Sequence, residues 1–104
     1  LLKLHRFLGN AIMLKDIIEA RPLPNLHLWI RFEDGVEGII AVAEHVRLDG
    51  VFAPLPDPAE FACVRVNTEL GWVEWPSGAD LDPDVLYALL TNFDAIKELQ
   101  RQHS

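Results

Sequence analysis

The chain has 104 residues, of which 50% are hydrophobic, so it can form one domain with its own core. Its formal net charge is −7 and its arginines are scattered, which argues against nucleic-acid binding, because that binding requires clustered positive charge. No apolar stretch approaches the roughly 18–20 residues of a membrane span. The acidity has two interpretations, which are solubility and complementarity to a small basic protein partner.

The single cysteine, Cys63, excludes an internal disulfide and a multi-cysteine zinc site. It suits a reducing compartment, so we expect a cytoplasmic protein. Because Cys63 lies in an alternating apolar run, we predict a buried and inert thiol, since reactive thiols need electropositive, partly exposed surroundings.

Residues 1–12 precede Met13 and allow two interpretations. Leu1, Leu4 and Leu8 have helical spacing, which predicts a short amphipathic helix. The alternative is a non-native upstream extension, with Met13 as the natural start. In either case we expect no chemistry from this segment.

The clearest local pattern is a β-hairpin. Residues 26–32 alternate, with Leu26, Leu28, Ile30 and Phe32 on one face and His27, Trp29 and Arg31 on the other. A turn at residues 33–35 with an Asp-Gly step leads to a partner strand at 36–42. The preceding apolar segment, 14–20, is expected to end before the two prolines of residues 21–25, because proline stops regular pairing.

The middle of the chain is read as short elements. Residues 42–48 predict a short helix, and the proline-rich residues 51–58 no regular element. Asp57 followed by Pro58 is typical of a helix N-terminus. A second hairpin is expected from the alternating run after Phe61, a turn at 68–71 and a strand at 72–75.

The C-terminal part predicts a helix beginning at Asp82-Pro83. Asp82 is the expected N-cap. Pro83 has no backbone N–H, and an N–H at this first helical position would have no partner in the helix. Asp84 places a negative charge at the positive end of the helix dipole. An apolar stripe follows at helical spacing, with an interruption predicted near Thr91. Strands first and a helix last indicate an α+β fold with a mainly antiparallel sheet of hairpins packed by short helices.

No catalytic, cofactor or metal constellation appears. Asp80, Asp82 and Asp84 have the spacing of the first ligands of an EF-hand loop, but Val85 replaces the required glycine and Thr91 the required glutamate. The four histidines are far apart and no phosphate-binding glycine loop or nucleophile elbow is present. The sequence therefore gives no positive support to an enzyme.

The aromatic residues are the strongest candidates for a binding role. Trp72 and Trp75 are three residues apart on the predicted strand, so they point to opposite faces. One interpretation packs both under the C-terminal helix. The other makes an outward tryptophan an interface anchor, a role in which tryptophan and tyrosine are common. The candidate interaction residues are Trp29, Trp72, Trp75, Asp80 and Tyr87.

Several ordered motifs resemble the bacterial family of domain of unknown function 2442. They are the strand end at 32–35, the segment at 50–55, Asp57-Pro58-Ala59-Glu60-Phe61, and above all the run from Val73 to Tyr87. Ser77 departs from the asparagine usual in the family, within a turn. The resemblance covers about residues 13–90, taken as a single domain, and leaves 91–104 as a helical tail.

The resemblance implies a small α+β domain, which some members fuse to a helix-turn-helix domain. Members encoded beside small proteins of another family suggest toxin–antitoxin-like pairs. No catalytic residues are implied.

Three functions follow as hypotheses. The first is a non-enzymatic protein-interaction domain, the antitoxin-like member of such a pair. The second is a small-molecule-binding module or enzyme with a pocket near Trp75 and Asp80. The third is a transcription-associated regulator acting through a partner. We also expect a homodimer, because short hairpin sheets leave edges that need covering.

Overall fold

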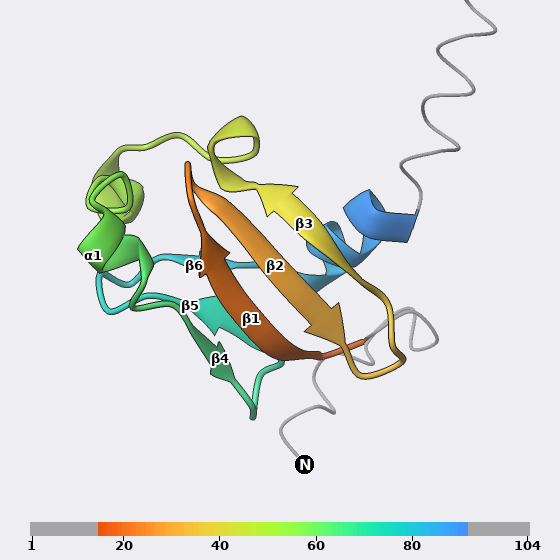
Figure 1. The fold of residues 1–104 in the computed structure, drawn as a ribbon. Coiled ribbons are helices and arrows are strands. Elements are labelled where there is room, and N and C mark those ends of the chain that lie inside the picture. The colour runs from red at the N-terminus through yellow and green to blue at the C-terminus, as the bar shows by residue number, and fades with distance from the viewer. Residues whose placement is uncertain (1–14, 92–104) are drawn as a thin grey trace, which may run out of the picture.

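A computed structural model of the chain describes residues 15–91, so the predictions for residues 1–12 and for the tail beyond 91 lie outside the described residues. The described part contains two antiparallel three-stranded sheets, with strand orders β1-β2-β3 and β4-β5-β6 (Figure 1). The strands are β1 Ile17–Leu23, β2 His27–Phe32, β3 Glu37–Ala41, β4 Arg65–Asn67, β5 Trp72–Glu74 and β6 Asp80–Leu81. This confirms the α+β class, with the strands divided between two sheets.

The first sheet contains the hairpin that the sequence predicts. On β2, Leu28, Ile30 and Phe32 are fully buried, whereas the alternate residues are half-buried. The turn at 33–35 is closed by hydrogen bonds between Phe32 and Val36 and between Gly35 and Phe32. Beyond β3, Val42–Glu44 form a short 3-10 helix, η3, so only the start of the predicted helix at 42–48 is helical.

The prediction that prolines end the first segment is wrong, because β1 continues through Pro22 to Leu23. The physical reason is the edge position of β1. The ladder alternates, and Val42 donates to the carbonyl of Leu26, so the even-numbered residues of β2 bond toward β3. Pro22 pairs with Leu28 and therefore stands where an amide would point away from β2, so its missing N–H removes no ladder bond.

The second sheet and its preceding turns follow the capping chemistry of the sequence. Along the chain, β3 and β4 are separated by η3, by a second 3-10 helix, η4 (Gly50–Phe52), and by a short helix, α1 (Pro58–Phe61). The Asp57 side chain accepts from the amide of Ala59 at 3.0 Å, as expected for an N-cap. The turn 68–71 joins β4 to β5 and closes with a bond from Gly71 to Asn67.

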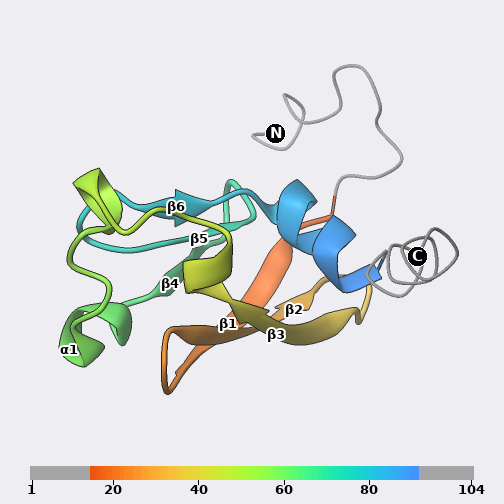
Figure 2. The ribbon, with the colours of Figure 1, turned by 90° about the horizontal axis from the view of Figure 1, so that it is seen from above.

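The core lies between two layers, the first sheet and the second sheet with the C-terminal helix (Figure 2). Residues 83–91 are helical, and Asp82 caps them by accepting from the amide of Asp84 at 2.9 Å, which confirms the predicted helix start. Both layers and the connecting segments supply core residues, which are Ile17, Leu28, Ile30, Phe32, Ile40, Val42, Leu55, Phe61, Val73, Trp75, Ala79, Leu81 and Leu86.

The prediction of a buried Cys63 is wrong. Cys63 is exposed and lies in the turn between α1 and β4, where its thiol donates to the carbonyl of Ala59 at 3.3 Å. The paired strand begins only at Arg65, so the alternation in the preceding residues belongs to a helix end and a turn.

Candidate interaction site

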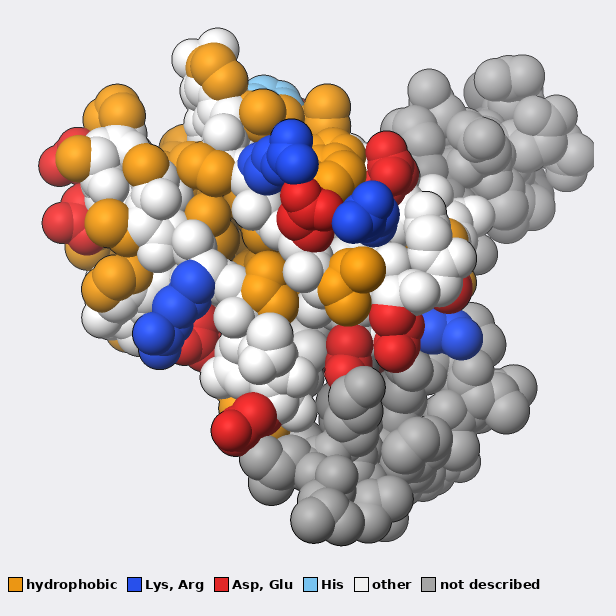
Figure 3. All heavy atoms as spheres, turned by 60° about the horizontal axis from the view of Figure 1, so that its bottom comes forward, with side chains coloured by type: hydrophobic (Ala, Val, Ile, Leu, Met, Phe, Trp, Pro, Cys, Tyr) orange, Lys and Arg blue, Asp and Glu red, His pale blue; other side chains and the backbone are white. Residues whose placement is uncertain are grey.

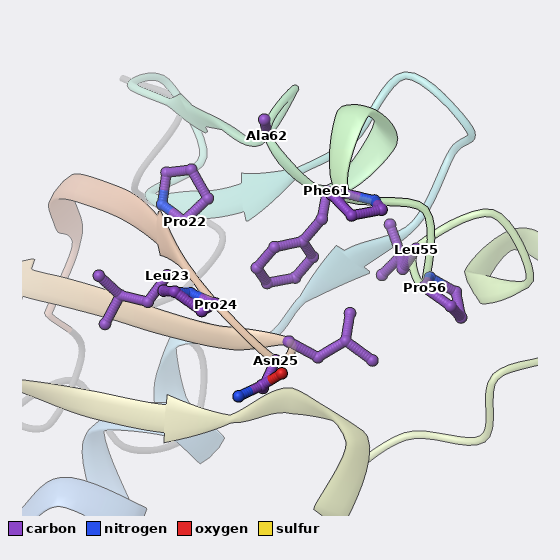
Figure 4. A pocket seen from close by; sticks show the side chains of 10 residues that line it. Pro22, Leu23, Pro24, Asn25, Leu55, Pro56, Phe61 and Ala62 are labelled. Carbon is purple, nitrogen blue, oxygen red and sulfur yellow. The ribbon is translucent and has the colours of Figure 1, made fainter.

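A surface cavity lies where the β1–β2 turn faces α1 and the segment before it (Figure 4). It has a volume of about 660 Å³, and we call it the proline groove. In Figure 4 the ring of Phe61 points toward the β1–β2 hairpin, with Pro22 and Leu55 on either side. The lining residues are Pro22, Leu23, Pro24, Asn25, Leu26, Leu55, Pro56, Pro58, Phe61 and Ala62.

Leu26 is held in an uncommon conformation at this groove. It has a φ of +59°, and Asn25 before it has a φ of +61°. Asparagine tolerates this left-handed region, but for leucine the contact of Cβ with the backbone costs about 1–2 kcal/mol. The amide of His27 donates a hydrogen bond to the carbonyl of Pro24 at 3.4 Å, which closes the turn. The amide of Val42 donates to the carbonyl of Leu26 at 2.9 Å. The surrounding structure therefore fixes a strained residue in the groove wall.

Trp75 supports the groove floor from within. The rings of Phe61 and Trp75 stack with centroids 5.6 Å apart, and the indole N–H of Trp75 donates to the carbonyl of Phe61 at 3.0 Å. Trp75 is only 3% exposed. The next turn is anchored as well, since the Ser77 hydroxyl donates to the carbonyl of Val51 at 2.7 Å.

The groove lining is suited to apolar contact rather than to acid–base chemistry. Asn25 contributes the one polar side chain of the lining, and none of the lining side chains titrates. Its exposed prolines are already restricted in conformation, so covering them loses little entropy. A ligand here would be held by burial of apolar surface.

Trp29 lies on the outer face of the first sheet, away from the groove floor. The guanidinium of Arg21 lies 5.1 Å from the centre of its ring. Glu19 accepts from Arg21 at 2.6 Å and from Arg31 at 2.7 Å. On the face in Figure 3, basic and acidic side chains lie next to each other with apolar side chains around them. Trp29 is half-buried within this ion-pair network.

Trp72 on β5 and Trp75, directly after it, point to opposite faces, with Trp75 in the core and Trp72 half-buried. The indole N–H of Trp72 donates to Glu74 at 2.8 Å, and Asn67 donates to the same oxygen at 3.1 Å. Arg65 forms an ion pair with the other carboxylate oxygen at 2.6 Å. These bonds, led by that of Trp72, lower the pKa of Glu74. Glu74 thereby links β5 to Asn67 and Arg65 of β4, and Trp72 helps to orient its carboxylate.

Tyr87 connects the C-terminal helix to the β2–β3 turn. Its hydroxyl donates to Asp34 at 2.6 Å, and its ring meets Phe32 edge-on with centroids 5.0 Å apart. The hydrogen bond stabilises the carboxylate, so it lowers the pKa of Asp34, and it raises the pKa of Tyr87 because the phenol must keep its proton to donate.

The structure does not bring the five candidate residues into one site. Trp29, Trp72 and Tyr87 lie in separate contacts, Trp75 lies beneath the proline groove, and Asp80 is exposed on β6. Neither Trp75 nor Asp80 lines the groove. Sequence reasoning missed the groove, and the signal for it was the set of prolines in two distant segments, 22–24 and 56–58.

Within residues 15–91 there is no group of three or more His, Cys, Asp or Glu side chains able to share a metal ion. In the same range no helix has the length and apolar character needed to cross a membrane.

Fold and groove together define a small α+β domain with two antiparallel sheets and an apolar surface groove. The chain belongs to the family described as "Protein of unknown function (DUF2442)", which matches residues 17–92. No curated protein and no solved structure matches the chain.

Proposed function

We propose that this domain is a non-enzymatic protein-interaction module that binds an apolar segment of a protein partner in the proline groove. The observation that carries the proposal is Leu26, a leucine kept at a φ of +59° in the groove wall. Strained backbone persists where the surrounding structure fixes it, and it concentrates at binding sites. A glycine at this position would avoid the strain but would remove an apolar wall of the groove.

The chemistry of the lining supports a protein segment over a polar metabolite. Small-molecule sites place several polar groups to orient the ligand, whereas this lining offers one amide side chain. A pocket at Trp75 and Asp80 has less support, because the Trp75 indole is buried and its N–H is already bonded to Phe61.

The finer features of the partner belong to the same proposal. A net charge of −7 favours a basic protein, and exposed Asp57 and Glu60 lie on the α1 side of the groove. The domain would then be the antitoxin-like member of a two-protein pair, with the partner encoded nearby. An exposed thiol, Cys63, suits the reducing cytoplasm in which we place it.

The test is capture of the partner by matched variants. Pro22→Asp places a charge in the groove, and Val85→Asp places the same charge on an exposed residue in the first turn of the C-terminal helix, where an acid is favourable. We expect the wild type and Val85→Asp to retain one specific host protein, which Pro22→Asp loses. Equal capture by all three, or by none, would contradict the proposal. Co-expression with the neighbouring gene product then tests the antitoxin-like role through growth.

A further inference from the structure

The two edges of the first sheet differ in protection. On β1, Pro22 removes an outward amide and the register shifts between Ile17 and Glu19. The amide of Ile17 donates to the carbonyl of Gly71, in the β4–β5 turn, at 2.9 Å. Proline, irregular pairing and cover by other chain segments are the usual means of closing a sheet edge. This edge is therefore unavailable to another strand.

The β3 edge has none of these protections within the described residues. Because Gly38 and Ile40 bond toward β2, the amides and carbonyls of Glu37, Ile39 and Ala41 point outward. The pairing of β3 with β2 is regular along its whole length. Ile39 is 57% exposed, although it is a β-branched residue in the middle of the strand.

A second cavity of about 310 Å³ lies beside this edge. Its lining includes Ile39 and Ile40 of β3, His45 after η3, and Leu89 and Leu90 of the C-terminal helix. We call it the edge groove. An added strand places alternate side chains on opposite faces, so one set would enter the edge groove and the other would cover Ile39.

Charge selects the occupant of this edge. Glu37 and Glu44 are both exposed, and within residues 15–91 neither carboxylate forms an ion pair or a hydrogen bond. Antiparallel pairing with a second copy centred on Ile39 would align Glu44 with the turn that holds Asp34, so like charges would meet. A segment with lysine or arginine would instead meet both carboxylates.

We propose that the β3 edge binds an extended segment of a protein, basic and apolar in alternation, as an added antiparallel strand. The inference rests on the proposed function in taking a protein as the ligand, but it assigns a second surface, separate from the proline groove. Main-chain bonds at Glu37, Ile39 and Ala41 supply affinity, and Glu37, Glu44 and the edge groove supply specificity.

The experiment uses the full chain and a short synthetic peptide of alternating lysine and valine, with amide exchange followed by NMR. We expect the peptide to slow exchange at Glu37, Ile39 and Ala41, while the amides of Gly38 and Ile40 are protected from the start. The same peptide with glutamate in place of lysine should not bind. Glu37→Lys combined with Glu44→Lys should reverse this preference.

Two further variants test the main-chain bonds. Ile39→Pro removes one outward amide and should weaken the binding of the lysine peptide about tenfold, the equivalent of one lost backbone hydrogen bond. A cooperative thermal unfolding transition shows whether this variant folds. If it does not fold, Ile39→Lys takes its place and is compared with Ile18→Lys on β1. The two side chains have similar exposed fractions, 57% for Ile39 and 50% for Ile18. Only the substitution on β3 should weaken the binding of the lysine peptide.

The outcomes separate this proposal from the function proposed above. Equal binding of both peptides, or exchange unchanged on β3, overturns the added strand. A wild-type dimer that Ile39→Pro or Ile39→Lys converts to a monomer shows that a second copy occupies the edge, and also overturns it. If the peptide does not protect β3 but partner capture still depends on Pro22, only the added strand is overturned. If the peptide protects β3 but capture does not depend on Pro22, only the proline groove is overturned.

Discussion

The two turns of the first sheet solve the same conformational problem with different residues. The β2–β3 turn needs a left-handed residue and has Gly35, with a φ of +92°. The β1–β2 turn also needs left-handed residues, but uses Asn25 and Leu26. Asn-Gly is the pair that such turns favour, so leucine replaces the residue that would be least strained.

The surroundings of the turns explain the difference. A Cβ added at Gly35 would meet nothing within 4 Å, so a side chain there would gain no contact. The Leu26 side chain lines the proline groove and also packs against the core. The comparison indicates that strain is tolerated where a side chain forms a surface and avoided where it would not.

The largest effect is expected from Phe61→Ala, which removes the floor of the proline groove. Phe61 is 4% exposed and stacks on Trp75, so the free energy of unfolding should fall by about 3–5 kcal/mol. In urea unfolding and amide exchange, the β1–β2 turn should loosen much more than the β2–β3 turn. Equal loosening of both turns would show that the groove does not hold the strained one.

Gly35→Ala tests the unstrained turn. The methyl group has open space, so the loss of stability should be conformational alone, about 1–2 kcal/mol. Gly35→Asn is the matched control and should lose less, because asparagine tolerates positive φ. Equal losses for the two variants in urea unfolding would contradict the strain argument.

Tyr87→Phe should lower the free energy of unfolding by a smaller amount, about 0.5 kcal/mol, because the hydrogen bond to Asp34 that it removes lies at the surface. The lowered pKa of Asp34 means that its contribution is present above the usual value of 3.8 and lost as pH falls through the folded pKa. The raised pKa of Tyr87 means that its contribution is present below 10.0 and lost as pH rises through the folded pKa.

Stability against pH, compared between wild type and Tyr87→Phe, checks this bond. The difference between the two proteins should vanish at both extremes and be largest between them. Both proteins should still lose the stability that Glu74 contributes as the solution becomes acidic, because the pKa of Glu74 is lowered by Trp72, Asn67 and Arg65. A difference that does not depend on pH would mean that the bond does not form in solution.

The sequence predicted the features that depend on neighbouring residues. Capping at Asp57 and Asp82, the hairpin turns and the burial alternation of β2 follow from local chemistry. The proline groove was missed because residues 22–26 and 55–62 form it only when the connecting segment with α1 packs beside the first sheet. Pro22 was misjudged because sequence does not reveal which strand lies at an edge, and Cys63 because alternation does not reveal where pairing begins.

Leu26→Gly tests the central claim most directly, because it creates the favoured Asn-Gly turn while removing a wall of the groove. Relief of about 1–2 kcal/mol of strain should offset the lost packing of a half-buried leucine, so the free energy of unfolding should stay within about 1 kcal/mol of wild type. Capture of the host partner, measured on the same preparation, should be lost. Destabilisation of about 2 kcal/mol or more with capture unchanged would instead make Leu26 an ordinary packing residue.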